Sequence, residues 1–287
     1  MSLKGKIIAV TGANSGIGKE TARALAEMHA HVILICRNED KAISAQQDIM
    51  ALTGNPKVDI LLCDFSRHVS IREMSEKFHA QYSHLDVLVN NAGGIVGEKK
   101  MTPDGFEWMF GVNHLGYFLT THYLFPAIEQ SKHARIVNVA SLAHRFSGFD
   151  PDNMNAEKSF GEMKTYGFSK LCNILFTRKL ASITQGRNVA VNSLHPGSIN
   201  SNFGNSGSPF FNGLIRTFGK YLLKTTVQGA RTSIHLASSN EVEGITGEHF
   251  SDCRVVIPSA TARNQGYADL LWERSCALTG IHTFGKF

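Results

Sequence analysis

Residues 6–18 read KIIAVTGANSGIG, a short apolar run that ends in three closely spaced glycines. Lys6–Val10 predicts a buried strand, and the following residues predict a helix over Gly16–Met28. Gly12 permits a tight turn, Gly16 lets backbone approach a phosphate, and Gly18 lets the helix pack on the strand. The helix N-terminus would offer its free N–H groups and positive dipole end to a pyrophosphate. The predicted cofactor contacts in this stretch are Gly12, Asn14, Ser15, Gly16, Ile17 and Gly18.

Short apolar runs alternate with segments of helical period along the rest of the chain. The further predicted strands are His31–Cys36, Val58–Cys63, Asp86–Asn90, Arg135–Ala140, Val189–His195 and a run near Gly247–Phe250. The further predicted helices reach Leu52 and span Ile71–Tyr82, Pro103–Gln130, Thr165–Ser182 and Val227–Ser238. This alternation is typical of a parallel sheet with right-handed helical crossovers. No linker divides it, so we expect one doubly wound, Rossmann-type α/β domain over residues 1–287.

Composition excludes several classes of protein. The formal net charge of +5 is too small and dispersed for a nucleic-acid binder. Five cysteines without a C-x-x-C pair indicate reduced thiols, and thirteen histidines without a ligand motif predict no metal site. No signal peptide and no apolar run of about 20 residues is visible, so we expect a cytoplasmic protein without a transmembrane segment.

The tip of the second predicted strand discriminates between nicotinamide cofactors. An acidic residue there usually binds the 2′-hydroxyl of NAD. This chain has Cys36-Arg37-Asn38 instead. Because Arg37 can pair with a 2′-phosphate, the sequence favours NADP(H), with Arg37 and Asn38 as cofactor contacts.

Tyr166 and Lys170 lie four residues apart and would share one helix face. A phenol with a pKa near ~10 is a poor proton relay at neutral pH, and a nearby ammonium is expected to lower that pKa. Ser141 follows the predicted strand Arg135–Ala140, where its hydroxyl could stabilise charge on a substrate oxygen. The three residues predict a proton-transfer site.

The ordered motifs resemble the short-chain dehydrogenases/reductases over nearly the whole chain. They are Thr11–Gly18, Asp64, Asn90-Asn91-Ala92-Gly93, Asn113, Ser141, Tyr166 with Lys170, and Pro196-Gly197. The segments Tyr166–Phe176, His195–Gly197 and Phe250–Cys253 look like the retinol dehydrogenase branch, which includes the oxidoreductase half of the WW-domain-containing oxidoreductase.

The resemblance implies a role for each motif. Asp64, with its neighbour Phe65, would contact the adenine. Asn91, Ala92 and Gly93 would line the adenine ribose, and Pro196 and Gly197 would lie along the nicotinamide. Lys170 would also bind the nicotinamide ribose, Tyr166 would exchange a proton with the substrate oxygen, and Asn113 would hold a water of the proton relay. The hydride chemistry belongs to the cofactor.

The substrate side of the sequence is apolar. The resemblance places a substrate lid at about residues 198–225, where Pro209–Lys224 carries an apolar stripe at helical spacing beside a basic line. The stripe fits a lid with peripheral membrane contact, and it equally fits a helix packed on its own domain. Five aromatic residues would line an apolar pocket if they converge: Phe146, Phe149, Phe203, Phe210 and Phe211.

The expected substrate is therefore a lipophilic carbonyl compound or its alcohol, of a retinoid, steroid-like or medium-chain kind. Two alternatives stay open: a non-catalytic dinucleotide-sensing protein, and a reductase of quinones or tetrapyrroles. Family members often pair through the helices that carry Asn113 and Tyr166, so the resemblance also leaves a homodimer open.

Overall fold

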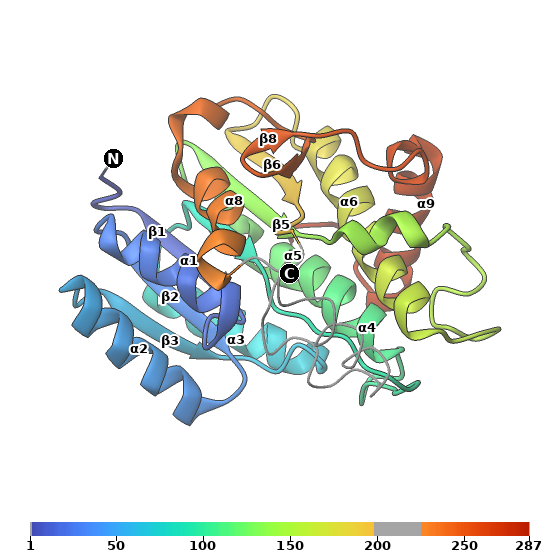
Figure 1. Ribbon diagram of the computed structural model, residues 1–287, viewed down its shortest axis with the longest axis horizontal. Helices are drawn as coiled ribbons and strands as arrows, with labels where there is room; N and C mark the ends of the chain where they lie inside the picture. The colour runs from blue at the N-terminus through green and yellow to red at the C-terminus, as the bar shows by residue number, and fades with distance from the viewer. Residues whose placement is uncertain (1, 198–224, 287) are drawn as a thin grey trace.

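A computed structural model describes residues 2–197 and 225–286. Its centre is one eight-stranded sheet with the order β3-β2-β1-β4-β5-β6-β7-β8 (Figure 1). The strands are β1 (Ile7–Thr11), β2 (His31–Cys36), β3 (Val58–Leu62), β4 (Val87–Asn90), β5 (Ala134–Val139), β6 (Val189–Leu194), β7 (His249–Ser251) and β8 (Arg254–Val255). All neighbouring strands are parallel except β8, which pairs antiparallel with β7. The predicted doubly wound α/β fold is confirmed.

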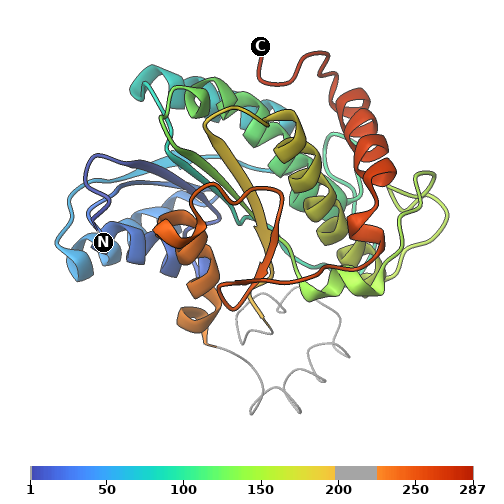
Figure 2. The same ribbon diagram turned by 90° about the horizontal axis from the view of Figure 1, so that it is seen from above.

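Helices cover both faces of the sheet. In Figure 2, α1 (Gly16–Glu27), α2 (Glu39–Thr53) and α8 (Thr226–Ser238) lie below it. Above it lie α3 (His68–Gln81), α5 (Gly116–Glu129) and α6 (Glu162–Ile183), with α9 (Gln265–Thr279) outside α6. The short α4 (Trp108–Phe110) and the one-turn helix η2 (Leu142–Phe146) lie near the N-terminal end of α6.

Both faces of the sheet are buried, which explains why its strands are almost continuously apolar. In β2, Ile33 and Ile35 pack under the layer of α3 and α5, whereas Val32 and Leu34 pack under the layer of α1 and α2. The chain reverses its direction of winding between β1 and β4. Parallel sheets bind their ligands outside the carboxyl ends of the strands at this switch point.

The structure differs from the sequence prediction in one expected helix and in several elements that were not expected, and it leaves the lid untested. The helix expected over Pro103–Gln130 begins only at Trp108 and is interrupted by a π-helical turn at Gly111–Leu115. The helices η2 and α9 and the strand β8 were not predicted. The expected lid at 198–225 lies outside the described residues apart from Thr225, which caps α8 by accepting a hydrogen bond from the Gln228 N–H. Of the predicted stripe over 209–224, no residue is described.

Candidate functional site

The glycine-rich turn joins β1 to α1 as predicted. Gly12 and Gly16 have φ angles of +67° and +56°, which favour glycine. A Cβ on Gly18 would collide with the Gly12 carbonyl oxygen and lie 2.5 Å from Asn91 Nδ2. Ser15, at the N-cap of α1, is exposed and makes no capping hydrogen bond through its side chain. The turn is therefore a tight cradle with an open helix N-terminus, which suits a phosphate.

The segment after β4 fixes this cradle to the sheet. Asn91 donates from its backbone N–H to Thr11 Oγ1 (2.8 Å) and from Nδ2 to the Thr11 carbonyl (2.8 Å). The Ala92 N–H also donates to Thr11 Oγ1 (2.8 Å). Asn91 therefore supports the turn with its side chain, and only the surrounding backbone is left to line a ribose.

The predicted adenine-side residues lie at the ends of neighbouring strands. Arg37 is exposed directly after β2, and Asn38 caps α2 by accepting a hydrogen bond from the Lys41 N–H (2.9 Å). Asp64 follows β3 and accepts hydrogen bonds from the N–H and hydroxyl of Ser66. Phe65 is buried and would contact any side chain added at Gly116. Arg37 thus keeps its charge in solvent, within reach of a ligand at this edge.

Tyr166 and Lys170 are buried on the inner face of α6, with exposed fractions of 8% and 2%. The Lys170 Nζ donates to the Val139 carbonyl at 3.1 Å and lies 5.8 Å from the centre of the Tyr166 ring. Tyr166 is hydrogen-bonded to the side chain of Ser141, the residue after β5. The structure therefore brings the three predicted residues together.

Burial changes the proton affinities of this pair. It raises the pKa of Tyr166 to about 12, although the hydrogen bond from Ser141 works in the opposite direction. It lowers the pKa of Lys170 to about 7. The expectation that a nearby ammonium would lower the pKa of the phenol is wrong for this state of the protein, because burial raises that pKa and the opposing contribution comes from Ser141. At neutral pH the phenol keeps its proton, and the amine can gain or lose one.

Asn113 lies in the π-helical turn Gly111–Leu115 beneath the site. Its side chain pairs with Gly94 in both directions: Nδ2 donates to the Gly94 carbonyl (2.9 Å) and Oδ1 accepts from the Gly94 N–H (2.9 Å). A Cβ on Gly93 would lie 2.6 Å from Asn113 Oδ1 and 3.6 Å from Lys170 Nζ. Asn113, Gly93 and Lys170 are therefore direct neighbours, as a shared site requires. Single-turn π-bulges in helices occur frequently at functional sites.

The predicted nicotinamide loop begins at the end of β6, two strands from β4. Gly197 has a φ of +87°, and its N–H donates to His195 Nδ1 at 3.1 Å. Pro196 is half-buried beside it. The loop leaves the same edge of the sheet as Ser141 and Asn91.

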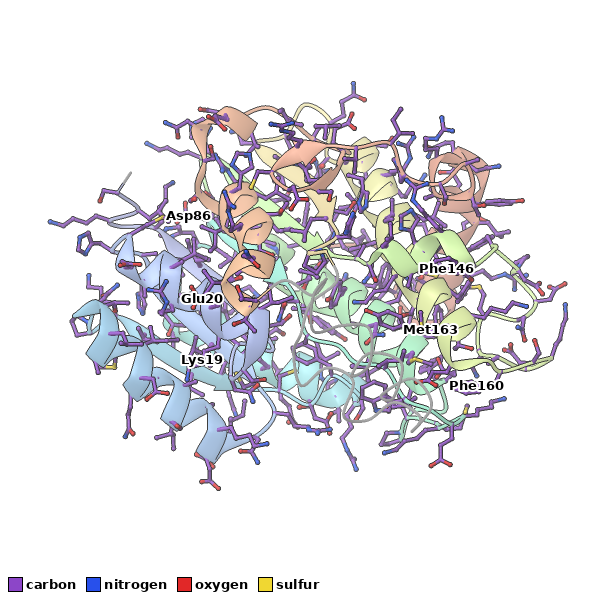
Figure 3. The ribbon with its side chains drawn as sticks, in the orientation of Figure 1. Lys19, Glu20, Asp86, Phe146, Phe160 and Met163 are labelled. Atoms are coloured by element: carbon purple, nitrogen blue, oxygen red, sulfur yellow. The ribbon has the colours of Figure 1, made fainter. Side chains whose placement is uncertain are left out.

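An apolar cluster surrounds Tyr166, and the sequence prediction missed most of it. Its members are Ile95, Val96, Trp108, Met109, Ala143, Phe160 and Met163. Met163 lies in the first turn of α6, and Phe160 lies just before that helix (Figure 3). The members of the whole cluster come from four separate segments of the chain, so no local pattern in the sequence predicts the cluster.

Of the five phenylalanines predicted to line a pocket, the structure describes Phe146 and Phe149. Phe149 stacks on Tyr267 of α9 with 5.0 Å between ring centres. Phe146 projects from η2 with 69% of its surface exposed (Figure 3). Phe203, Phe210 and Phe211 lie outside the described residues.

Two features are absent from residues 2–197 and 225–286. No group of three or more His, Cys, Asp or Glu side chains is arranged to hold a metal ion in this part of the chain. Its helices include none long and apolar enough to cross a membrane.

The similarity to known proteins covers all the site residues described above. A family model described as short chain dehydrogenase matches residues 6–209. Human retinol dehydrogenase 11 is 43% identical over 281 residues, which cover 98% of the chain and 88% of that relative. Human retinol dehydrogenase 14 is 37% identical over 298 residues, with coverages of 97% and 88%. A solved structure of an uncharacterised protein from Mycobacterium paratuberculosis has a TM-score of 0.80 and 28% identity, covering 100% of this chain and 97% of the other.

Proposed function

The chain belongs to the short-chain dehydrogenase family and is an oxidoreductase of alcohols and carbonyl compounds, and on this premise we propose that it interconverts a lipophilic carbonyl compound and its alcohol with NADP(H). The observation that carries the proposal is the contact of Tyr166 with Ser141 and Lys170 inside an apolar cluster. A proton-transfer group in apolar surroundings suits a substrate whose only polar atom is the reacting oxygen.

The residues around the turn fit a dinucleotide. Gly16 faces open space at the N-terminus of α1, where Asn14, Ser15 and Ile17 would present their backbone to a pyrophosphate. Gly12 and Gly18 let the turn pack closely against Ala92 and Asn91. The adenine half would contact Asp64, Phe65 and the backbone of 91–93, and the nicotinamide half would contact Pro196, Gly197 and Lys170. Arg37, with Asn38 beside it, would bind the 2′-phosphate, since no carboxylate occupies the tip of β2. When bound, the nicotinamide supplies or accepts the hydride.

Tyr166 would exchange the proton. With its pKa raised to about 12, the phenol is protonated at neutral pH and can donate to the oxygen of a carbonyl as negative charge develops there. Ser141 would donate a second hydrogen bond to the same oxygen and stabilise its charge. The protonated phenol is the form that reduction requires, whereas oxidation requires the form that has lost its proton.

Lys170 would return the proton to Tyr166. Its pKa of about 7 lets it gain a proton from solvent and pass one on at physiological pH. Asn113 would support this relay, because its side chain holds Gly94 and its carbonyl accepts from Asn173 Nδ2 (3.0 Å) with a lone pair left for a water.

The names of the relatives narrow the substrate. Two of them are called retinol dehydrogenases, and the cluster around Tyr166 offers aromatic and thioether side chains to a long apolar molecule. We therefore propose a retinoid-like aldehyde or alcohol as the substrate class.

A substrate panel tests the proposal. Purified protein should oxidise NADPH in the presence of retinal or a medium-chain aldehyde, at a rate well above that with NADH. Tyr166→Phe should lower kcat at least about 100-fold while leaving the Kd for NADPH within about twofold, since the loss of a general acid costs about that much. Turnover that survives in Tyr166→Phe would contradict the mechanism, and turnover of hydrophilic carbonyls alone would contradict the substrate class.

A further inference from the structure

His144 lies three residues beyond Ser141, in the one-turn helix η2, and it is 1% exposed. Its Nδ1 lies 2.7 Å from the Ser141 carbonyl oxygen. Its Nε2 lies 3.2 Å from the backbone N–H of Ser259. A carbonyl only accepts and an N–H only donates, so the ring must carry its hydrogen on Nδ1 and accept at Nε2. The two contacts therefore select one neutral tautomer.

Both the backbone carbonyl and the side-chain hydroxyl of Ser141 are held by hydrogen bonds. Its carbonyl accepts from the His144 ring and also from the His144 N–H (3.2 Å). Its hydroxyl accepts from the Ala143 N–H (3.2 Å) and contacts Tyr166. Because the backbone of residue 141 is extended, with φ −157° and ψ 155°, the direction of its carbonyl fixes the direction of its Cβ. The Ala143 N–H then holds the hydroxyl on that Cβ.

The catalytic helix packs closely against η2 at the same point. A Cβ on Gly167 would lie 2.5 Å from the Ala143 carbonyl oxygen. Gly167 is the neighbour of Tyr166, so this close approach fixes the distance between η2 and the Tyr166 hydroxyl. Any rotation of the Ser141–Leu142 peptide would therefore change the geometry between Ser141 and Tyr166.

His144 also belongs to a row of three imidazole rings behind the site. The ring of His249, on β7, lies 5.4 Å from that of His144 and 6.0 Å from that of His195. His249 is paired with Ser193 Oγ (3.0 Å), and His195 accepts from the Gly197 N–H. The row connects the loop after β5 with the loop after β6. Burial lowers the pKa of His144 and of His249, so these two rings stay neutral at physiological pH.

We propose that His144 is a positioning residue for Ser141. Its Nδ1–H holds the Ser141 carbonyl, and this hydrogen bond directs the Ser141 hydroxyl toward Tyr166 and the substrate oxygen. The Ser259 N–H keeps the hydrogen on Nδ1 by occupying Nε2. The inference rests on the proposed function, because the readout is carbonyl turnover.

Two substitutions of His144 distinguish the role of Nδ1 from that of Nε2. The amide nitrogen of an asparagine can occupy the place of Nδ1, whereas that of a glutamine can reach only the place of Nε2. We expect His144→Asn to keep kcat within about threefold of the wild type. We expect His144→Gln to lower kcat at least about tenfold with the KM for NADPH within about twofold, because misorientation of a catalytic group acts on the chemical step.

The decisive control is the same substitution without the Ser141 hydroxyl. In a Ser141→Ala background, His144→Gln should change the residual kcat less than about twofold, since there is no hydroxyl left to direct. An equal loss in both backgrounds would show a merely structural role and overturn the inference. Equal damage from His144→Asn and His144→Gln would overturn it as well.

The tautomer of the wild-type protein gives a test that needs no altered protein to be active. Long-range proton–nitrogen NMR spectra of 15N-histidine-labelled protein, assigned by the signal missing in His144→Asn, should show the hydrogen on Nδ1. A hydrogen on Nε2 would remove the proposed donor and refute the inference. Absence of wild-type turnover with every carbonyl tested would instead refute the proposed function, and the spectra would still decide the tautomer.

Discussion

At the scale of single residues, Lys170 links catalysis to stability. An ordinary lysine titrates near pH 10.5, whereas the folded protein lowers this pKa to about 7. The unfolded chain therefore binds more protons than the folded one between these pH values. Stability contributed at Lys170 is greatest above pH 10.5, declines as the pH falls toward 7, and changes no further below that.

This linkage predicts the behaviour of Lys170→Met. We expect this variant to be inactive, and to gain stability relative to the wild type as the pH is lowered from 10 to 7, by on the order of a few kcal/mol because one pH unit of displacement is worth about 1.4 kcal/mol. Urea unfolding of both proteins at pH 6.5, 8 and 9.5 measures the difference, in which all other titrating groups cancel. Parallel stability curves would contradict the lowered pKa.

In the proposed function, Arg37 is the residue that determines the choice of cofactor. Arg37→Asp should lower kcat/KM for NADPH by roughly 10- to 100-fold, since a hydrogen bond to a charged group contributes about 1.5–3 kcal/mol. The value for NADH should stay the same or rise. Arg72→Asp, an exposed arginine of α3, is the matched control for the change in net charge. Equal losses with both cofactors would count against 2′-phosphate recognition.

At the scale of elements, the sequence predicts those whose pattern is local. The glycine turn and the strands of the sheet could be recognised because glycine spacing and continuous apolar runs need no knowledge of tertiary contacts. The π-helical turn at Asn113 could not, since residues 109–122 are all buried and show no amphipathic period that an extra residue would shift. The helix η2 has only five residues, too few for any period.

The helix α9 was missed although its ends carry recognisable signals. Asn264 caps it by accepting from the Tyr267 N–H (3.1 Å), and Gly280 ends it with a φ of +69°. Its interior is mixed: the buried residues are Ala268, Leu271 and Ser275, and both apolar and polar residues lie between them. The apolar face becomes evident only against α6. The same holds for the cluster around Tyr166, whose members meet only in the folded chain.

At the scale of the whole molecule, α9 and the tail after it cover the outer face of α5 and α6. Trp272 stacks on Phe176 of α6 with 6.0 Å between ring centres and meets Phe118 of α5 edge-on at 5.4 Å. Phe284 of the tail packs on Phe118 and Phe125 (both 5.4–5.5 Å). Figure 2 shows α9 lying along α6, with the C-terminal tail beyond it.

The packing of α9 and the C-terminal tail on α5 and α6 predicts the effect of a substitution at Trp272. Trp272→Ala should lower the free energy of unfolding by about 2–3 kcal/mol, since truncating a large packed aromatic leaves a cavity. It should also expose aromatic surface on α5 and α6 and promote self-association, measured by sedimentation velocity. Glu273→Ala, an exposed neighbour on the same helix, should change neither property. A wild-type dimer cross-linked between two copies of α6 would contradict the prediction.

The helices α5 and α6 are covered by α9, which belongs to the same chain. This contact forms during folding, and it does not depend on the protein concentration. Lys170, the residue of the proposed relay, lies on the inner face of α6, one of these covered helices. We therefore expect the geometry around Lys170 to be independent of the protein concentration, and the specific activity to remain constant on extreme dilution. An enzyme whose corresponding helices meet across two chains would lose activity under the same conditions.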